Sequence, residues 1–383
     1  MYSKRRLLLR PALITLMFAA LLLTACGSRV ANQSWPGLST NGEKLYLANG
    51  GTVSAYFADT QDLAWSYPAE ANASLQFYAA PSVEGDRVVF GDYGAAGGFF
   101  SPSVTVSIYA VEDTDNGGTP PEIWTNGEQA NDKIVAPPLQ VGDDLYVGTA
   151  DNFMVAFDAN SGENRWVFET EHSIWGQPAY RDGVLFVSSM DRSIYALDSE
   201  SGEELWKTSF VGAIASGPVL NEELVYVSDF DSQIHALDIH SGEERWAAPA
   251  ENWVWGSPAY ADSVVYFADV EGNVFAVDAL TGEAIWQQKT PGAAQTSPVI
   301  ADDIVYVASE GESSEVPIGA LRAFAVEDGR ELWTVPTPAP LFTTPVIVDD
   351  AVVVALQSEE AILIAFDRQT GGRLWTIAPP TES

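Results

Sequence analysis

Residues 194–206 read IYALDSESGEELW, and the same phrase returns at intervals of 40 residues on either side. Residues 154–166 read MVAFDANSGENRW, residues 234–246 read IHALDIHSGEERW and residues 274–286 read VFAVDALTGEAIW. A fifth copy, LIAFDRQTGGRLW, occupies residues 363–375. In each copy an Asp precedes a Trp by eight residues. Self-similarity at a fixed period of this length is the signature of a repeat architecture.

Three degenerate copies bring the number of units to eight. They end at Trp65, at Trp124 after a longer turn, and at Trp333 after a turn over 327–329 that reads as shorter. We predict that the Trp of each unit is a structural anchor packed between neighbouring units, because aromatic side chains bury large areas. The predicted anchors are Trp65, Trp124, Trp166, Trp206, Trp246, Trp286, Trp333 and Trp375.

Each unit reads as four short strands. In residues 217–248, the run 224–228 is rich in β-branched residues and residues 241–243 (Ser-Gly-Glu) supply a turn. Helical periodicity is not convincing anywhere after residue 30. Residues 35–383 are therefore predicted to form an all-β, eight-bladed β-propeller with four antiparallel strands per blade. A β-helix would have shorter coils, and a sandwich would not need eight matching Trp. How the ring closes is left open.

The N-terminus is predicted to direct export. Lys4, Arg5 and Arg6 precede an apolar run over residues 12–23, which is short for a membrane-spanning helix of about 20 apolar residues. The run ends in Leu23-Thr24-Ala25-Cys26, which resembles a bacterial lipobox. Residues 1–25 are thus interpreted as a lipoprotein signal peptide, Cys26 as the lipidated residue, and residues 26–34 as a linker. The alternatives are an uncleaved anchor and an ordinary secretory peptide with a chance Cys.

Charge and cysteine content exclude several classes of partner and site. The chain has 18 Lys+Arg against 53 Asp+Glu, a formal net charge of −35. Phosphate backbones and anionic lipid surfaces would be repelled, so we expect no nucleic-acid partner. Cys26 is the only cysteine, which leaves no intramolecular disulfide and no Cys-based metal site.

The repeated phrase, (I/L/V)-(Y/F)-A-(L/F/V)-D-x-x-(S/T)-G-E-x-x-W, resembles the repeat of PQQ-type, quinoprotein-like β-propellers. Residues 194–206 and 274–286 match it well, and the resemblance extends over nearly all of 35–383. The family includes quinoprotein alcohol dehydrogenases and BamB-like exported lipoproteins of outer-membrane assembly. The repeat is specific for the fold and not for the function. The lipobox, the chain length and the eight units resemble the BamB-like members more.

The resemblance includes dehydrogenases, but this sequence lacks the residues that their chemistry requires. Such members generally have longer chains, a Glu/Asn/Asp calcium cluster, a catalytic Asp and often a vicinal Cys pair. Here the acidic pairs, such as Asp143-Asp144 and Asp302-Asp303, recur where hairpin turns need polar residues. We therefore predict no catalytic residue, no metal site and no cofactor. PQQ with calcium is kept as an alternative.

The remaining polar motifs are weak. The three histidines, His172, His235 and His240, form no recognisable catalytic motif, and His235 replaces the aromatic of the third strand. Residues 113–117 (DTDNG) resemble the start of a calcium loop, but its twelfth position is Trp124 and not Glu. We interpret this segment as an acidic hairpin tip.

Departures from the repeat indicate a candidate site. Trp175 and Trp255 stand at equivalent places immediately before the innermost strand of their blades, at one mouth of the central channel. Tyr78 and Phe342 occupy the same place in two other blades. These four aromatics form either a binding pocket with few polar groups or a plug that fills the channel. The sequence does not separate these readings.

The sequence therefore predicts an exported lipoprotein, anchored to a membrane through Cys26 on the extracytoplasmic side and monomeric. Its leading functional interpretation is a non-catalytic scaffold that binds an envelope protein or peptide through a propeller face. Loops on a rigid scaffold carry such functions. A lipoprotein that binds a small ligand or glycan at the aromatic mouth is the alternative, followed by a PQQ-dependent dehydrogenase.

Overall fold

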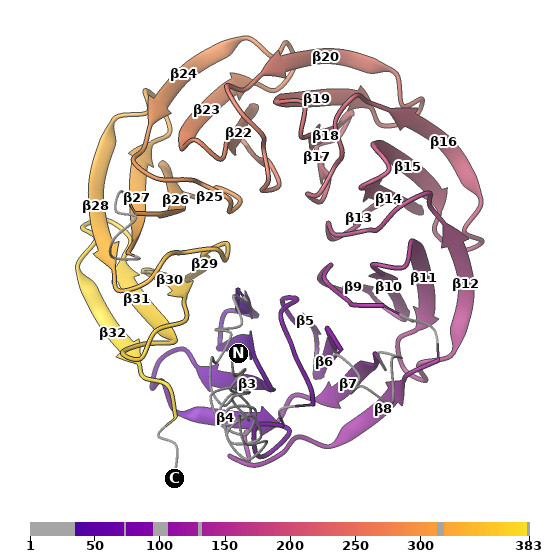
Figure 1. Ribbon diagram of the computed structural model, residues 1–383, viewed down its shortest axis with the longest axis vertical. Helices are drawn as coiled ribbons and strands as arrows, with labels where there is room; N and C mark the ends of the chain where they lie inside the picture. The colour runs from indigo at the N-terminus through magenta and orange to yellow at the C-terminus, as the bar shows by residue number, and fades with distance from the viewer. Residues whose placement is uncertain (1–34, 73, 95–105, 129–131, 312–317, 381–383) are drawn as a thin grey trace, which may run out of the picture. The chain divides into compact units, whose positions relative to one another are not determined.

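The fold is an eight-bladed β-propeller, as predicted. The computed structural model describes residues 35–72, 74–94, 106–128, 132–311 and 318–380, so the predicted signal peptide, Cys26 and the linker lie outside the described residues. Eight four-stranded sheets follow one another in chain order around a ring (Figure 1). Within these residues we find no helix of the length and apolarity needed to cross a membrane.

Each blade is an antiparallel meander of four consecutive strands, the first innermost and the fourth outermost (Figure 1). Blades 1 to 4 consist of β1 (Gly37–Thr40), β2 (Lys44–Asn49), β3 (Thr52–Phe57), β4 (Leu63–Tyr67); β5 (Ser82–Glu84), β6 (Arg87–Gly91), β7 (Ile108–Glu112), β8 (Glu122–Asn126); β9 (Leu139–Val141), β10 (Asp144–Gly148), β11 (Phe153–Asp158), β12 (Asn164–Glu169); and β13 (Ala179–Arg181), β14 (Val184–Ser189), β15 (Ser193–Asp198), β16 (Glu204–Ser209).

Blades 5 to 8 repeat the pattern. They consist of β17 (Val219–Leu220), β18 (Leu224–Ser228), β19 (Gln233–Asp238), β20 (Glu244–Pro249); β21 (Ala259–Ala261), β22 (Val264–Ala268), β23 (Asn273–Asp278), β24 (Ala284–Lys289); β25 (Val299–Ala301), β26 (Ile304–Glu310), β27 (Gly319–Ala325), β28 (Glu331–Thr337); and β29 (Val346–Val348), β30 (Ala351–Ala355), β31 (Leu363–Asp367), β32 (Arg373–Ile377).

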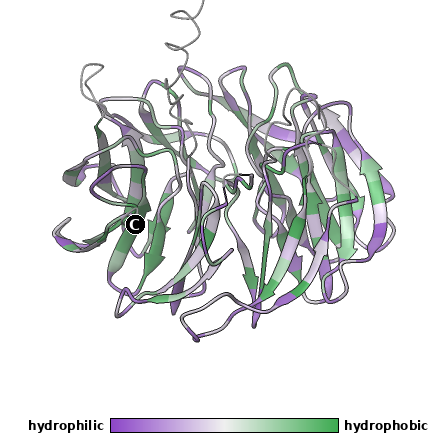
Figure 2. Ribbon diagram, turned by 60° about the horizontal axis from the view of Figure 1, so that its bottom comes forward, coloured by the Kyte–Doolittle hydropathy of each residue, from purple (hydrophilic) through white to green (hydrophobic). Residues whose placement is uncertain are grey.

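The core lies between the blades. The second and third strands of each blade are the apolar ones, and their side chains pack against those of the next blade, as Tyr226 and Ile234 do against Val265 and Phe267. The outermost strands alternate exposed and buried residues, as in β20. Figure 2 shows the hydrophobic strands inside the ring and more hydrophilic segments toward its ends. Hydrophobic burial therefore holds each blade to its neighbours.

The repeated turn explains why the phrase recurs. In blade 6 the Oδ1 atom of Asp278 accepts hydrogen bonds from the backbone N–H groups of Leu280 and Thr281, at 3.0 and 2.8 Å. Gly282 then takes a φ of +71°, a conformation that side chains rarely adopt. A Cβ atom there would also lie 2.6 Å from the ring of Trp246, the anchor of the preceding blade. Asp278, Thr281 and Gly282 thus form a turn against which that ring packs, and we call such a turn the seat of the anchor.

In six blades a carbonyl oxygen of the seat also holds the indole N–H of the anchor. Trp246 is 9% exposed and donates this N–H to the carbonyl oxygen of Ala279, at 3.1 Å. Because a buried donor without a partner is costly, the bond fixes the ring in one orientation. Equivalent bonds join Trp124 to Ala159, Trp166 to Ser199, Trp206 to Ile239, Trp286 to Val326 and Trp333 to Arg368.

Two details of the degenerate units differ from expectation. The turn before Trp333 is not shorter: the N–H of Gly329 bonds to the carbonyl oxygen of Ala325, as Gly282 does to Asp278, so Ala325 stands eight residues before Trp333. Sequence comparison missed the match because Ala325 replaces the Asp that marks the start of the turn.

The segment at Asp113 is not a simple acidic tip. Asp113 receives hydrogen bonds from the Trp65 indole N–H at 2.7 Å and the Tyr46 hydroxyl at 2.6 Å, and forms an ion pair with Lys44 at 3.0 Å. The side chains of Lys44 and Asp113 are both less than a tenth exposed. Asp113 therefore provides the seat for Trp65 that a carbonyl and a Gly provide elsewhere, while Asp115 next to it remains exposed.

The ring closes by packing, without an exchanged strand among the described residues. β1 to β4 form blade 1 and β29 to β32 form blade 8. Leu38 and Leu47 pack against Val353 and Leu363 across this seam. The Thr343 hydroxyl donates to the carbonyl oxygen of Pro36. The first and last blades are thus joined by the same kind of hydrophobic contact as the other pairs.

Candidate functional site

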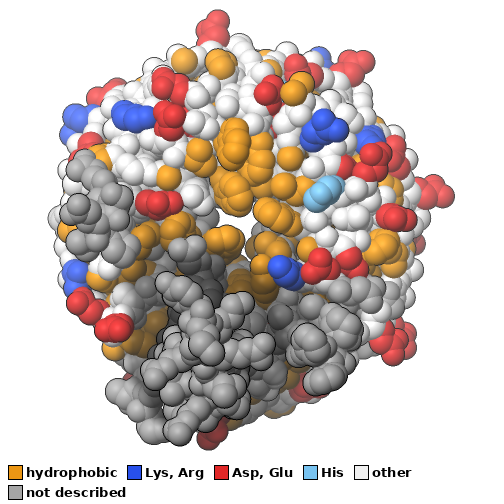
Figure 3. Space-filling view, viewed as in Figure 1, with side chains coloured by type: hydrophobic (Ala, Val, Ile, Leu, Met, Phe, Trp, Pro, Cys, Tyr) orange, Lys and Arg blue, Asp and Glu red, His pale blue; other side chains and the backbone are white. Residues whose placement is uncertain are grey.

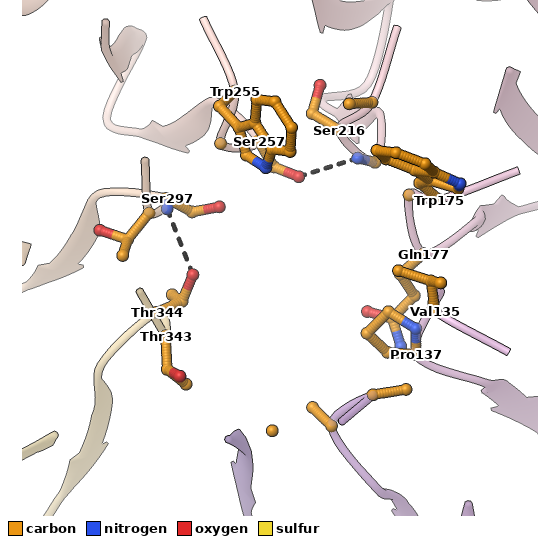
Figure 4. Close-up of a pocket in the computed structure, with 18 of the residues that line it drawn as sticks. Val135, Pro137, Trp175, Gln177, Ser216, Trp255, Ser257, Ser297, Thr343 and Thr344 are labelled. Carbon is orange, nitrogen blue, oxygen red and sulfur yellow. Dashed lines mark hydrogen bonds between the residues drawn. The ribbon is translucent and has the colours of Figure 1, made fainter. Parts of the chain in front are cut away.

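The four predicted mouth aromatics line one cavity on the channel axis. Its volume is about 510 Å³, and every blade borders it with a residue from the segment before its innermost strand, among them Val135, Trp175 and Trp255 in Figure 4. Four of the aromatic members are partly buried, and Trp35 is 45% exposed. The eight equivalent residues are Trp35, Tyr78, Val135, Trp175, Ala215, Trp255, Gln295 and Phe342.

Close contact between neighbouring backbones holds this rim in place. A Cβ atom on Gly176 would lie 2.4 Å from the backbone of Ser216 in the next blade, so only Gly fits there. The backbone N–H of Gly217 donates to the Ser257 hydroxyl at 2.9 Å, and the equivalent bond from Ser297 to Thr344 measures 3.2 Å (Figure 4). The rim is therefore a rigid, hydrogen-bonded ring that presents its side chains toward the axis.

The aromatic residues form two groups on opposite sides of the ring. Trp175 in blade 4 and Trp255 in blade 6 contact each other with ring centroids 6.2 Å apart at 46°. Blade 5 between them contributes Ala215, whose small side chain leaves room for this contact. Across the axis, Trp35 and Phe342 lie 6.3 Å apart at 57°. Rings tilted in this way pack favourably and still leave faces available to a ligand.

Sequence reasoning missed Trp35 as a member of this rim. A weak signal was present: Trp35 stands six residues before Asn41, just as Ala215 stands six residues before Asn221. Both Asn side chains accept hydrogen bonds from the two residues that open the following strand. Aligning the units on this Asn turn, and not on the Trp anchor, would have placed Trp35 correctly.

A second set of aromatics extends the Trp175–Trp255 pair outward. Phe230, at the tip of the hairpin between β18 and β19, stacks on Trp255 with centroids 5.1 Å apart at 28°. Trp253 stacks on the same Phe230 ring at 5.6 Å and 24°. Figure 3 shows hydrophobic side chains gathered around the central hollow on this face. Phe230 was missed because hairpin tips are usually solvated and the contact depends on side-chain orientation.

The cavity is polar only through uncharged groups. None of its described lining residues is Asp, Glu, Lys, Arg or His. The Gln177 amide donates to the carbonyl oxygen of Pro138 at 2.9 Å, and the Gln295 amide donates to Glu310 at 3.0 Å. Burial raises the pKa of Glu310, which lies behind Gln295 and outside the lining. Such a cavity can stack against apolar or aromatic groups, and the Tyr78 hydroxyl is the one titratable side chain among its described lining residues.

The lining does not fit calcium-bound PQQ. Ca²⁺ requires six to eight oxygen ligands and usually several carboxylates, whereas the described lining offers amides and hydroxyls. No group of three or more His, Cys, Asp or Glu able to hold a metal ion occurs among the described residues. We therefore derive no redox step at this site.

The histidine on strand β19 has a packing role. The His235 ring lies 4.2 Å from the Phe210 ring between centroids, and its Nδ1 atom lies 3.0 Å from Glu244. His235 is 6% exposed and is not among the residues that line the cavity. These contacts hold blade 5 to the loop that precedes it.

Comparison with known proteins identifies the repeat family. A family model described as outer membrane protein assembly factor BamB matches residues 154–252 and 231–382, together more than half of the chain. BamB from Moraxella catarrhalis has a similar crystal structure, with a TM-score of 0.65, 18% identity, and 93% of this chain and 97% of that chain covered. No curated protein matches the sequence.

Two further solved structures share the architecture. The computationally designed Ika8 protein has a TM-score of 0.68 and 16% identity, with 90% of this chain and 97% of that chain covered. A europium-containing methanol dehydrogenase has a TM-score of 0.63 and 13% identity, with 78% and 77% covered. At these identities the similarity concerns the fold alone, since one fold hosts unrelated functions.

Proposed function

Because the chain belongs to the PQQ-type propeller family whose model is described as outer membrane protein assembly factor BamB, we propose that it is a non-catalytic envelope scaffold. Its partner is a protein or peptide of the membrane-protein assembly machinery, bound at the aromatic mouth. The observation that carries this proposal is the uncharged cavity of about 510 Å³ rimmed by Trp35, Tyr78, Trp175, Trp255 and Phe342.

The physical argument rests on what the rim offers. Large, rigid aromatic side chains give much contact area at a low cost in side-chain entropy, and Trp and Tyr are enriched among the residues that dominate binding energy. Trp175 and Trp255 have no hydrogen-bond partner for their indole N–H among the described residues, so each N–H is available to a ligand.

Anchoring completes the proposal. A lipid on Cys26 holds the protein at a membrane, and an extended linker from Cys26 to Trp35 spans at most about 30 Å. Changing Cys26 to Ser is expected to abolish lipid labelling and release the protein from membranes. Retention of the Cys26→Ser protein in the membrane fraction would show instead that the apolar segment 12–23 is the anchor.

The test is a pull-down from native envelopes with full-length protein in mild detergent. The variant replaces Tyr78, Trp175, Trp255 and Phe342 together with Ala. The control replaces Leu205 and Leu374, exposed apolar residues on outermost strands, with Ala. We expect the partner to be retained by wild type and control and lost by the mouth variant, while circular dichroism of all three stays the same. Equal retention by the folded mouth variant would overturn the proposal.

A small ligand or glycan is the second candidate. The tilted Trp175–Trp255 pair and the amide of Gln177 resemble the mixture of aromatic and polar groups in small-molecule sites, and the cavity volume lies in their range. Saturable quenching of Trp fluorescence by sugars, lost in Trp255→Ala, would favour this candidate.

Catalysis is tested separately. Purified protein supplied with PQQ and Ca²⁺ is screened with alcohols and sugars and an artificial electron acceptor. We expect no turnover, because the described lining has no carboxylate, His or Lys to take a proton. Turnover that is lost on changing a channel-facing residue would replace the scaffold proposal with an enzymatic one.

A further inference from the structure

Four aromatic rings form a continuous track that leaves the cavity. Trp175 contacts Trp255, Trp255 stacks on Phe230, and Phe230 stacks on Trp253. We call these four residues the aromatic track. Trp175 and Trp255 belong to the cavity rim, whereas Phe230 and Trp253 lie outside its lining. The track therefore runs from the mouth across blades 5 and 6 toward solvent.

The outer end of the track is exposed. Trp253 is 52% exposed, and Val211, in the loop whose Ala213 carbonyl accepts the backbone N–H of Phe230, is 73% exposed. Exposed apolar side chains that gather on one part of a surface mark interaction sites, because leaving them in water is unfavourable. Trp253 keeps this exposure although it stacks on Phe230.

Two buried carboxylates hold the loops around the track in place. Asp229 and Asp269 are buried carboxylates, 1% and 0% exposed, one beneath each track-bearing loop. Asp229 accepts the backbone N–H of Gly212 at 3.2 Å, and Asp269 accepts that of Asn252 at 3.1 Å. The neighbouring blades at these positions use Ser189 and Ser309. A site fixed before binding loses less conformational entropy when its partner arrives.

The charge around the track selects the partner. Asp231 and Glu251 are exposed on the loops that carry Phe230 and Trp253, and Glu271 is exposed on the neighbouring hairpin between β22 and β23. Only Glu271 has a basic neighbour in the described structure, Lys289 at 3.7 Å. The track thus combines aromatic faces, which attract cations, with an excess of carboxylates. This combination suits Lys or Arg side chains adjacent to apolar ones and disfavours acidic peptides.

From this geometry we infer that the aromatic track binds an extended peptide segment of a partner protein in which basic residues alternate with aromatic or aliphatic ones. The three distances between successive ring centroids along the track add up to roughly 17 Å. An extended strand covers this length in about five residues. The inference rests on the proposed function and adds to it the chemistry of the bound segment and the path that the segment follows.

The test is selection from a random twelve-residue phage-displayed peptide library on full-length protein in detergent. We expect the selected peptides to be net positive and to contain at least one aromatic residue. For a selected peptide, Phe230→Ala and Trp253→Ala should each weaken binding about tenfold, as at aromatic hot spots. Asp231→Asn combined with Glu251→Gln should weaken it and reduce its salt dependence.

The matched control is Leu280→Ala. Leu280 is 69% exposed and lies in the turn between β23 and β24, at the opposite end of the blade, so its change should leave peptide binding unaltered. Selected peptides that are neutral or acidic would overturn the inference. So would self-association of the protein that Trp253→Ala abolishes, because the track would then bind a second copy.

The remaining outcomes separate the inference from the proposed function. Peptides that bind regardless of Phe230→Ala and Trp253→Ala, but are lost with Tyr78→Ala and Phe342→Ala, would overturn the track and leave the mouth as the binding site. Failure to select any peptide, together with a pull-down in which the mouth variant retains the same partner as wild type, would overturn both.

Discussion

Two sets of tryptophan residues, the blade anchors and those at the cavity rim, have opposite environments. Trp246, a blade anchor, is 9% exposed, rests on Gly282 and donates its N–H at 3.1 Å. Trp255, only nine residues later, is half-buried at the cavity and contacts other rings. One set holds blades together, and the other presents aromatic faces at the channel mouth.

The difference shows how a repeat separates structure from function within a single chain. The anchor position is Trp in all eight blades, because every blade boundary needs the same wedge. The rim position varies from Trp and Tyr to Val, Ala and Gln. Since all eight rim positions have similar backbone surroundings, packing alone would give them similar residues. Their variation is expected of a site that recognises one partner from one side.

The largest expected effect belongs to an anchor. Trp246→Ala should lower the free energy of unfolding by about 3–5 kcal/mol, through loss of a buried ring and of its hydrogen bond. Urea melts followed by far-UV circular dichroism measure the change. A loss below about 1 kcal/mol would mean that the anchors do not hold the blades together.

The seat should be nearly as sensitive as the ring it carries. Gly282→Ala should cost about 2–4 kcal/mol, because it combines a strained φ with a clash against Trp246. Gly183→Ala is the control: its φ is +82°, but nothing lies within 4 Å of the added Cβ, so it should cost only about 1–2 kcal/mol. Equal losses would remove the ring contact from the explanation.

A rim aromatic should affect stability much less. Trp255→Ala should cost about 1 kcal/mol, the contribution of ring contacts to a half-exposed side chain. The same melts measure it, and partner capture should fall in the same variant. A loss equal to that of Trp246→Ala would identify Trp255 as a core residue and favour the interpretation of the rim as a plug.

The smallest expected effect is a difference in acid sensitivity. The Arg165 guanidinium, with the backbone N–H groups of Ser161 and Asn160, lowers the pKa of Asp158 to about 2, whereas an unfolded Asp has a pKa of about 3.9. This turn therefore stabilises the fold above about pH 4 and loses that contribution as the pH falls toward 2. The exposed pair contributes at most about 1 kcal/mol.

A matched pair of variants isolates this contribution. Between pH 7 and pH 3 the melting temperature of Asp158→Asn should fall less than that of wild type, since Asn cannot be protonated there. Trp255→Ala should show the wild-type decrease, because the cavity lining has no carboxylate. An unchanged decrease in Asp158→Asn would show that this turn does not contribute to acid sensitivity.

Much of the architecture could be predicted because the repeated unit occurs eight times and each copy indicates the same four strands. The strand order, the anchors and the cavity position of Trp175 follow from spacing alone. The role of Asp113 could not, because its partners Trp65 and Lys44 lie 48 and 69 residues away in sequence and belong to no repeated pattern.

The outer half of the candidate site was also hidden. Phe230 occupies a hairpin tip equivalent to Met190 and Val270, so its residue type is not unusual for the position. Only the ring contacts with Trp253 and Trp255 reveal it as part of a track. Such contacts depend on the angle between neighbouring blades and on side-chain rotamers, which one-dimensional spacing does not contain.

The central claim, that the aromatic mouth binds a partner protein, is tested most directly by photo-crosslinking in living cells. A benzophenone amino acid replaces Trp255 in one strain and Leu280, at the opposite end of the blade, in another. We expect ultraviolet light to join position 255 to a discrete envelope protein and position 280 to none. No adduct at position 255, or the same adduct at both positions, would contradict the account.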